Sequence, residues 1–329
     1  EWNQTQKTSP SPFTIQRFLR RLTAEGCTHA VIDYSSHGLV QGRTLCTWPS
    51  VAAITNTSPE HLDYHGTMEQ YRKDKGKLFR MLRGRGTKIL NRDDETYDQH
   101  LSFPSERTLS YSLSDPVASQ ISLRIPGKFN IENALCAITC AEAIGIPHQQ
   151  SIAALRTFAG IPGRMERIDE GQPFTVFVDF TVTPEAYRKT LTAVRAMLPE
   201  GKRLLVLTGS CGDRMHEKRP EIGKIVSQYA DVTVVTNEDP YTEDPEHIIA
   251  EVWAGIDHTK TKAHRIVDRK EAVTFLFKEA QPGDIVLLCG KGSDTTMWMK
   301  EGQIPWNERE IVRYLLRHIA SAPERSQAA

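Results

Sequence analysis

A lysine occupies an unusual position in the segment "ITNTSPEHLDYHGTMEQYRKDKGKLF", which covers residues 54–79. Thr67 is a typical helix N-cap, and Gln70 three residues later completes a capping box. From there apolar residues recur with the i, i+3, i+4, i+7 spacing of one helix face, and Lys75 falls among them. An ammonium group therefore stands where an apolar side chain is expected.

Burial would change the chemistry open to Lys75. Burial without a partner lowers the pKa of a lysine, and a neutral amine can add carbon dioxide to become a carbamate. The carbamate is an anion with oxygen donors, which suit a hard cation such as Mg²⁺. Alternatively, Lys75 lays its stem along the apolar face and keeps its ammonium in water. Spacing alone does not decide between these two interpretations.

Two further groups could join such a site. His61 follows a strand predicted at 51–56, and Asp33 lies near the end of a strand predicted at 29–35. A carboxylate and an imidazole at neighbouring strand ends can form a metal site, provided that the strands are adjacent. A lone histidine can equally be a packed or capping residue.

Glycine-rich turns with cations follow two predicted strands of the second half. "GSCGDRMHEKRP" at 209–220 carries Arg214 at a strand-to-helix turn, and "CGKGSD" at 289–294 would expose backbone N–H groups. A helix N-terminus with arginines is an anion site, for a carboxylate or a phosphate. The alternative is a solvated helix start with ordinary surface charges.

Composition limits the class of protein. The chain has 329 residues, with 39% hydrophobic and 25% charged, which predicts a globular protein of two domains. Lysine plus arginine and aspartate plus glutamate number 41 each, so we expect no nucleic-acid or membrane partner. No apolar run approaches the roughly 20 residues of a membrane helix. The six cysteines form no CxxC pair, which favours reduced thiols in a cytoplasmic protein.

The two halves differ in their organisation. The first half has predicted strands at 29–35, 51–56, 87–91, 107–113 and 119–125 and predicted helices at 15–24, 131–144 and 150–158, the first with Thr14 as N-cap. After a Gly/Pro-rich hinge at 160–169, strands and helices alternate to the end, which indicates a doubly wound parallel sheet. Ligands of such sheets lie beyond the carboxyl ends of the strands. No G-x-x-x-x-G-K-[ST] phosphate loop occurs in the sequence.

Eight sequence blocks in order resemble the Mur ligase family, and within it the MurE type. They are "DYSSHGLVQGR", the segment quoted above, "PGKFNIENALCA", "GIPGRMERID", "VDFTVTPEA", "GSCGDRMHEKRP", "TNEDPYTEDPEHI" and "CGKGSDTTM". The resemblance implies an α/β fold in which residues 1–162 are part of the central ATPase domain, without its phosphate loop. Residues 163–329 would be the C-terminal, Rossmann-like, amino-acid-binding domain.

The family reaction implied is ATP- and Mg²⁺-dependent amide-bond formation in peptidoglycan synthesis. An acyl phosphate of UDP-N-acetylmuramoyl-L-Ala-D-Glu is attacked by the amine of an amino acid, and domain closure at the hinge keeps water out. We expect a cytoplasmic monomer, N-terminally truncated relative to the family, that is inactive alone. The alternative is a non-catalytic, Mur-ligase-like binding or partner subunit; folate-type glutamate ligation fits the blocks less well.

The resemblance also implies roles for individual residues. Lys75 matches a carbamylated lysine that positions Mg²⁺, His61 matches a metal ligand, and Asp33 stands where the family usually has a glutamate near metal. Lys75, His61 and Arg164 are the expected catalytic residues, and Arg164 also contacts ATP phosphates. Residues expected to hold the UDP-muramoyl peptide are Thr8, Ser9, Ser35, Gln41 and Arg43. Residues expected at the nucleotide, beside Arg164, are Asn130, Asn133 and Asp179.

In the second half, Arg214, Gly290 and Asp294 match contacts to the incoming amino acid. The selectivity motif D-N-P-R of diaminopimelate enzymes is replaced here by Glu238-Asp239-Pro240-Tyr241. Tyrosine cannot form the bidentate pair of an arginine with a distal carboxylate. The acidic pair Glu238 and Asp239 suits a distal amine, so we expect lysine or ornithine in preference to diaminopimelate.

Overall fold

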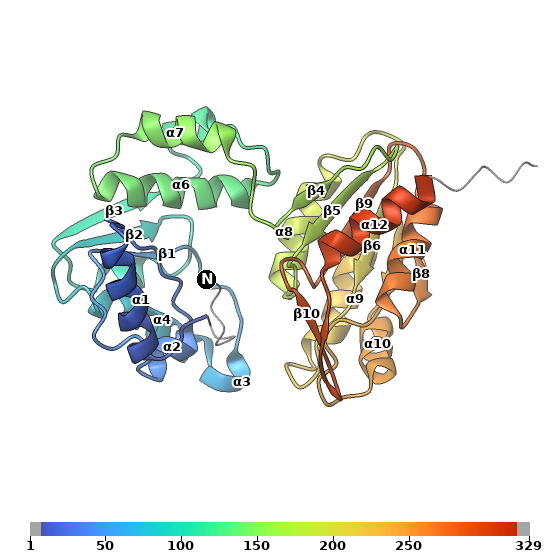
Figure 1. Ribbon diagram of the computed structural model, residues 1–329, viewed down its shortest axis with the longest axis horizontal. Helices are drawn as coiled ribbons and strands as arrows, with labels where there is room; N and C mark the ends of the chain where they lie inside the picture. The colour runs from blue at the N-terminus through green and yellow to red at the C-terminus, as the bar shows by residue number, and fades with distance from the viewer. Residues whose placement is uncertain (1–7, 321–329) are drawn as a thin grey trace, which may run out of the picture. The chain divides into compact units, whose positions relative to one another are not determined.

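The computed structural model describes residues 8–320, and these divide into two compact units (Figure 1). The first unit contains the chain up to Leu123 together with Asn130–Thr157, and the second contains Arg124–Phe129 and the chain from Phe158 onwards. No helix among the described residues has the length and apolarity needed to cross a membrane. All six cysteines are free thiols.

The first unit is built on a parallel sheet of three strands, β1 (Val51–Ile54), β2 (Thr87–Asn91) and β3 (Arg107–Tyr111), in that order. Alternate side chains of β2 enter opposite cores: Leu90 packs with Phe79, and Ile89 packs with Leu135. Helix α4 (Met68–Arg80) therefore covers one face, and α6 (Lys128–Ala143) covers the other. The remaining helices are α1 (Pro12–Ala24), α2 (Ser36–Val40), α3 (Leu62–His65), α5 (Tyr97–Leu101), η1 (Pro116–Gln120) and α7 (His148–Thr157).

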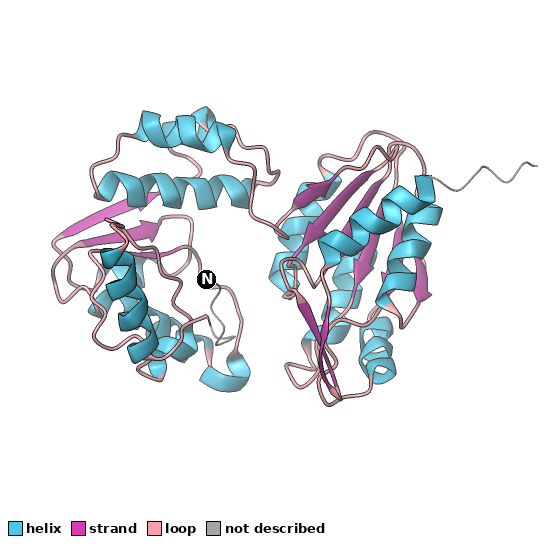
Figure 2. Ribbon diagram, in the orientation of Figure 1, coloured by secondary structure: helices cyan, strands magenta, loops and turns pink. Residues whose placement is uncertain are grey.

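The second unit is a doubly wound sheet with the order β4-β5-β9-β6-β7-β8, parallel except for β4 (Figure 2). Its strands are β4 (Glu166–Ile168), β5 (Thr175–Asp179), β6 (Leu204–Thr208), β7 (Val232–Val235), β8 (Lys262–Arg265) and β9 (Ile285–Cys289). Successive β9 residues alternate between two fully buried cores, as a strand with both faces covered requires. One face carries α8 (Pro184–Arg195), α9 (Lys218–Tyr229) and α10 (Pro245–Ala254), and the other carries α11 (Arg269–Glu279) and α12 (Glu308–Ala320).

Several local sequence predictions were wrong. Residues 29–35 form no strand, and Val31 is fully exposed, because β-branched composition gives a strand only where a neighbour completes the hydrogen-bond ladder. The strand predicted at 119–125 begins in the 3₁₀ helix η1 and continues as loop. Helix α1 starts at Pro12 with Ser11 as its N-cap, so Thr14 lies inside the helix. The hairpin of β10 (Thr296–Met299) and β11 (Gly302–Pro305) was not predicted.

A buried ion pair joins the strand ends of the second unit to its last helix. The side chains of Arg269 and Glu308 are each 1% exposed, and the guanidinium donates to the Glu308 carboxylate at 2.8–3.1 Å. The same guanidinium donates to the carbonyls of Asn237, after β7, and Cys289, at the end of β9. These contacts fix the loops beyond β7 and β9, the two strands that flank β6 in the sheet.

Arg269→Ala should lower the free energy of unfolding of the second unit by about 3–5 kcal/mol, because Glu308 would remain buried without its cation. Urea unfolding followed by tryptophan fluorescence measures the change. The control is Arg167→Ala, which removes an exposed pair with Asp169 and should cost no more than about 1 kcal/mol. Equal effects of the two substitutions would contradict this role of the buried pair.

Candidate functional site

Lys75 points into the first unit. Helix α4 is capped at Thr67, whose Oγ1 accepts a hydrogen bond from the Gln70 amide at 3.2 Å, as predicted. On the face that carries Lys75, Tyr71 and Phe79 are buried. The Lys75 Nζ donates to the carbonyl of Asn56 at 3.0 Å and lies 5.2 Å from the Tyr71 ring centroid. The ammonium therefore meets the loop that follows β1.

Burial lowers the pKa of Lys75, and the carboxylates of Glu60, Asp94 and Asp33 oppose that shift. The amine thus lies within the electrostatic field of all three carboxylates, including Asp33, which the sequence had singled out. Glu60 and Asp94 were not predicted. Asp94 is positioned by the Thr57 amide, which donates to Oδ2 at 2.9 Å. A buried amine with a lowered pKa loses its proton more easily, and the neutral amine is the form that adds carbon dioxide.

His61 lies in an aromatic group rather than against Lys75. Its ring centroid is 4.7 Å from that of His37, and its Nε2 is 3.5 Å from the Glu60 carboxylate. The His61 backbone has φ 57°, in the left-handed region. Burial lowers the pKa of His37, and so do the neighbouring His61 and His65. The structure therefore links His61 to Lys75 only through a shared neighbour, Glu60.

The residues around Lys75 could hold a hard cation such as Mg²⁺ on one condition. Within residues 8–320, no three His, Cys, Asp or Glu side chains are arranged to hold a metal ion. An unmodified Lys75 would repel a cation beside Asp33, Glu60 and Asp94. A carbamate on Lys75 would replace that positive charge by two oxygen donors among carboxylates, the ligand type that Mg²⁺ prefers. The residues present fit the metal only with Lys75 modified.

Three of the residues expected at the muramoyl peptide lie together. The Ser9 Oγ accepts the Ser35 amide at 2.9 Å, and the Ser9 carbonyl accepts Arg43 Nη1 at 2.5 Å. Ser35 in turn caps α2 through the Gly38 amide at 3.1 Å. Gln41 is the C-cap of α2, and its side chain donates to the Tyr64 hydroxyl at 3.2 Å. Thr8, next to Ser9, is exposed.

The residues expected at the nucleotide are divided between the units. Asn130 is buried in α6 and Asn133 is exposed one turn later, both in the first unit. In the second unit the Asp179 Oδ2 accepts the Met165 amide at 2.7 Å, and burial raises the pKa of Asp179. The Arg164 guanidinium stacks on Phe180, 4.5 Å from the ring centroid. Asp179 and Arg164 thus belong to one loop cluster.

Beyond β7 and β9, a buried lysine neutralises the expected acidic residues. Lys291 is fully buried, and its Nζ donates to both Asp239 carboxylate oxygens at 2.8 Å and to Asp294 at 3.1 Å. Asp239 also accepts the Trp298 amide at 2.8 Å. The side chain of Glu238, the residue before Asp239, is buried, and burial raises its pKa. Its Oε2 has no hydrogen-bond partner among the described residues. Neither member of the acidic pair is therefore a free carboxylate at the surface.

Arg214 is an exposed cation in the loop that follows β6. Its Nη2 donates to the Tyr241 hydroxyl at 3.0 Å, and its guanidinium lies 5.1 Å from the Tyr241 ring centroid. The Tyr241 ring also stacks on Trp298, with 5.5 Å between centroids. Arg214 forms no ion pair with any residue of the described part. A groove of about 370 Å³ lies between Pro240–Pro245 and Met299–Glu301, and its lining includes Glu243, Asp244 and Glu301 but not Arg214.

Gly290 has a role that only glycine can fill. Its φ is 108°, and a Cβ there would lie 2.6 Å from the Glu238 Oε2. The contact explains its position in the turn without requiring a ligand. Sequence reasoning missed Lys291 and Trp298, although Lys291 stood inside the quoted block "CGKGSD"; its charge was overlooked because only the backbone donors of that block were considered.

Comparison with known proteins gives one family. Residues 1–120 match the model described as Mur ligase middle domain, and residues 163–292 match Mur ligase, glutamate ligase domain. A UDP-N-acetylmuramyl-tripeptide synthetase of Roseiflexus sp. (strain RS-1) is 36% identical, over 96% of this chain and 70% of its own length. A UDP-N-acetylmuramoyl-L-alanyl-D-glutamate–2,6-diaminopimelate ligase of Geobacillus kaustophilus is 33% identical, over 93% of this chain and 68% of its own length.

Solved structures agree with this assignment. A UDP-N-acetylmuramoyl-L-alanyl-D-glutamate–2,6-diaminopimelate ligase is similar with a TM-score of 0.61 and 29% identity, over 95% of this chain and 69% of that one. A murein peptide ligase from Psychrobacter arcticus, with 19% identity and a TM-score of 0.57, covers 83% of this chain and 58% of its own and shares the fold.

The lowered pKa of Lys75 predicts a pH-dependent effect of Lys75→Met. Below the folded pKa the lysine is charged in both states, and burial of that charge opposes folding. As pH rises through the window between the folded pKa and the unfolded value near 10.5, only the unfolded state keeps the proton, so the penalty diminishes. Lys75→Met should therefore stabilise the first unit at neutral pH, and its advantage should shrink towards pH 10.

Thermal unfolding at a series of pH values measures this difference. Lys73→Met is the matched control, because Lys73 lies on the exposed side of the same helix. A stabilisation by Lys75→Met that grows with pH would contradict a lowered pKa.

Proposed function

Because the chain belongs to the Mur ligase family, we propose that it takes part in ATP-dependent amide-bond synthesis, joining an amino acid to UDP-N-acetylmuramoyl-L-Ala-D-Glu in peptidoglycan synthesis. The observation that carries this proposal is the Lys75 amine, held inside the first unit among Asp33, Glu60 and Asp94. The relatives named for the same reaction support the substrate and the MurE type.

The first unit supplies the charged groups near the phosphates. A Lys75 carbamate, with Asp33 and Glu60, would hold Mg²⁺, and His61 is placed to join through Glu60. When bound, the metal neutralises charge on phosphate oxygens. Ser9, Ser35 and Arg43 hold the muramoyl peptide, with Thr8 and Gln41 beside them. Asn130 and Asn133 face the adenine.

The second unit binds the remaining partners. Arg164 contacts ATP phosphate oxygens, and Asp179, already fixed to the Met165 amide, binds the ribose. Arg214 binds a carboxylate of the incoming amino acid. Asp294 and Gly290 line the same edge, where Lys291 sets the position of Asp294.

The charges at this edge favour an amino acid with a distal carboxylate. Lys291 neutralises Asp239 and Asp294, and Arg219 pairs with Glu243 at 2.7 Å, holding the pKa of that carboxyl at about 2. Each of these three carboxylates already has a cation as partner, so none is left unpaired to receive a distal ammonium. The expectation of lysine or ornithine therefore loses its physical basis, and the relatives named as diaminopimelate ligases support the diaminopimelate class, whose second carboxylate offers Arg214 a further partner.

A carbamate on Lys75 can be observed directly. In ¹³C-labelled bicarbonate at mildly alkaline pH, the chain should show one carbamate resonance by ¹³C NMR, strengthened by Mg²⁺. Lys75→Met and Lys75→Arg should both lack it, and Lys73→Met should keep it. A signal that survives in Lys75→Met would place the chemistry on another amine. Absence of any signal would favour the non-catalytic, binding-subunit alternative.

Direct binding tests the amino-acid class. Calorimetric titration should show meso-diaminopimelate binding at least about tenfold more tightly than lysine, a difference of roughly 1.4 kcal/mol. Arg214→Ala should remove that preference because the guanidinium is lost. Arg188→Ala, at an exposed arginine of the same unit, should leave it unchanged. Tighter binding of lysine would overturn the diaminopimelate assignment and leave the ligase proposal standing.

A further inference from the structure

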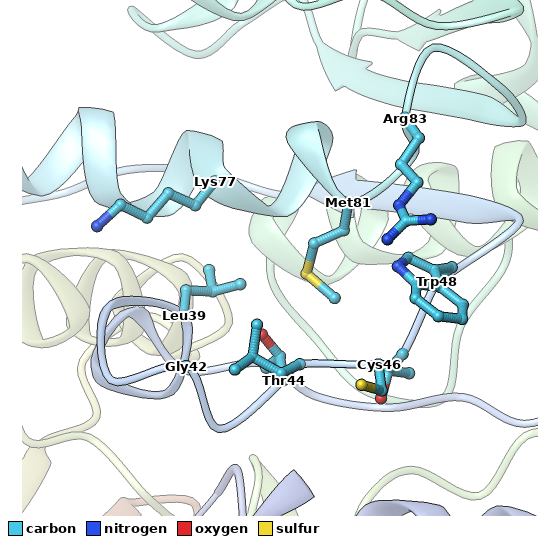
Figure 3. Close-up of a pocket in the computed structure, with 10 residues that line it drawn as sticks. Leu39, Gly42, Thr44, Cys46, Trp48, Lys77, Met81 and Arg83 are labelled. Atoms are coloured by element: carbon cyan, nitrogen blue, oxygen red, sulfur yellow. The ribbon is translucent and has the colours of Figure 1, made fainter.

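An apolar pocket lies in the first unit between α4 and the loop 42–48 (Figure 3). Its volume is about 270 Å³, and Leu39, Met81 and Trp48 supply much of its apolar wall. Figure 3 shows the side chain of Met81, the residue after α4, directed towards the loop, and the Arg83 guanidinium beside the Trp48 ring. None of the residues to which a site role is assigned above lines this pocket.

The pocket is exposed and preformed. Leu45 is 63% exposed and Trp48 is 57% exposed, although both are large apolar side chains. The loop that carries them is held in place by Gln16 of α1, whose Nε2 donates to the Cys46 carbonyl at 2.8 Å and to Thr47 Oγ1 at 3.3 Å. An occupant would therefore bury apolar surface without first ordering the loop, which lowers the entropic cost of binding.

The charge around the pocket has one sign. Two cations, Lys77 and Arg83, line it, and no carboxylate does. Lys77 is paired with Asp74 at 2.7 Å, whereas Arg83 lies 4.2 Å from the Trp48 ring centroid and forms no ion pair within the described residues. The surrounding segment 77–88, "KLFRMLRGRGTK", holds four cations besides the buried Lys88 and no acidic residue. Some cations are expected at a helix C-terminus, but Arg83 and Arg85 lie beyond the last helical residue, Arg80.

We propose that this pocket docks an acidic peptide segment of a partner protein, anchored by one bulky apolar side chain. A volume of this size accommodates an anchor side chain, because pockets for drug-sized ligands begin near about 300 Å³. Trp and Arg side by side are the residue types that dominate binding energy at protein interfaces. The uncompensated Arg83 then pairs with a carboxylate that flanks the anchor.

A fluorescein-labelled acidic peptide of about nine residues with a central Phe-Leu pair is the probe, since its carboxylates can reach Arg83 while the anchor fills the pocket. Fluorescence anisotropy should give a Kd on the order of 10 μM that weakens with added salt. The same peptide with lysines in place of its acidic residues should not bind. Equal binding of the two peptides would overturn the proposal.

Substitutions in and away from the pocket test whether the peptide binds there. Trp48→Ala and Arg83→Glu should each weaken binding at least tenfold, and Arg83→Lys should weaken it less because the charge is kept. Arg156→Glu, the same charge change at an exposed arginine of α7, should have no effect. Circular dichroism checks the folding of each variant, and Met81→Glu provides a second test of the pocket if Trp48→Ala does not fold. Unchanged binding by folded Arg83→Glu or Met81→Glu protein would overturn the proposal.

A second copy of this chain is the competing occupant. Sedimentation velocity over a range of concentrations distinguishes it from a peptide partner. We expect a single species whose mass does not depend on Trp48. Self-association that Trp48→Ala abolishes would assign the pocket to a contact between copies and would refute the peptide proposal.

Discussion

The energetic cost of burying a positive charge governs how both units are built. The buried ammonium of Lys88 is compensated by hydrogen bonds to three backbone carbonyls, those of His100, Leu101 and Phe103. The buried ammonium of Lys291 is compensated by ion pairs with two aspartates, Asp239 and Asp294. Lys75 donates to one carbonyl, that of Asn56, and burial lowers its pKa, as it lowers that of Lys88. Lysines fixed by several oxygens have structural roles, whereas a weakly compensated lysine is available for chemistry.

The same constraint changes how acidic residues should be interpreted. An aspartate already held by a buried lysine contributes to the shape of its loop, and its charge is no longer available to a ligand. Asp239 illustrates this, because its carboxylate accepts two bonds from Lys291 and one from the Trp298 amide. A prediction based only on the types of residue in a motif therefore assigns such groups the wrong electrostatic role. Arg214, in contrast, is exposed and forms no ion pair within the described residues.

Periodic patterns were sufficient for most of the architecture. The doubly wound sheet followed from the strands and helices that alternate after the hinge at 160–169. The ion pairs that organise the loops could not be predicted from the sequence, because their members are far apart in the chain. Lys291 and Asp239 are 52 residues apart, and Arg269 and Glu308 are 39 residues apart. The prediction of a strand at 29–35 was wrong for a related reason. The composition of this segment is typical of a strand, but strand pairing depends on neighbours far away in sequence.

Lys75 itself was detectable because the helical period is local, whereas its surroundings depend on the register of the sheet. Strands β1 and β2 run parallel with Ile54 opposite Leu90, so the loops after them leave at the same edge. Asn91 Nδ2 donates to the Thr55 carbonyl at 3.0 Å and ties these loops together. The Asn56 carbonyl thereby accepts a hydrogen bond from Lys75, and Asp94 lies close enough to oppose the lowering of the lysine pKa. A shift of one residue would turn each side chain to the opposite face, so the environment of Lys75 follows from strand pairing and not from the helix that carries it.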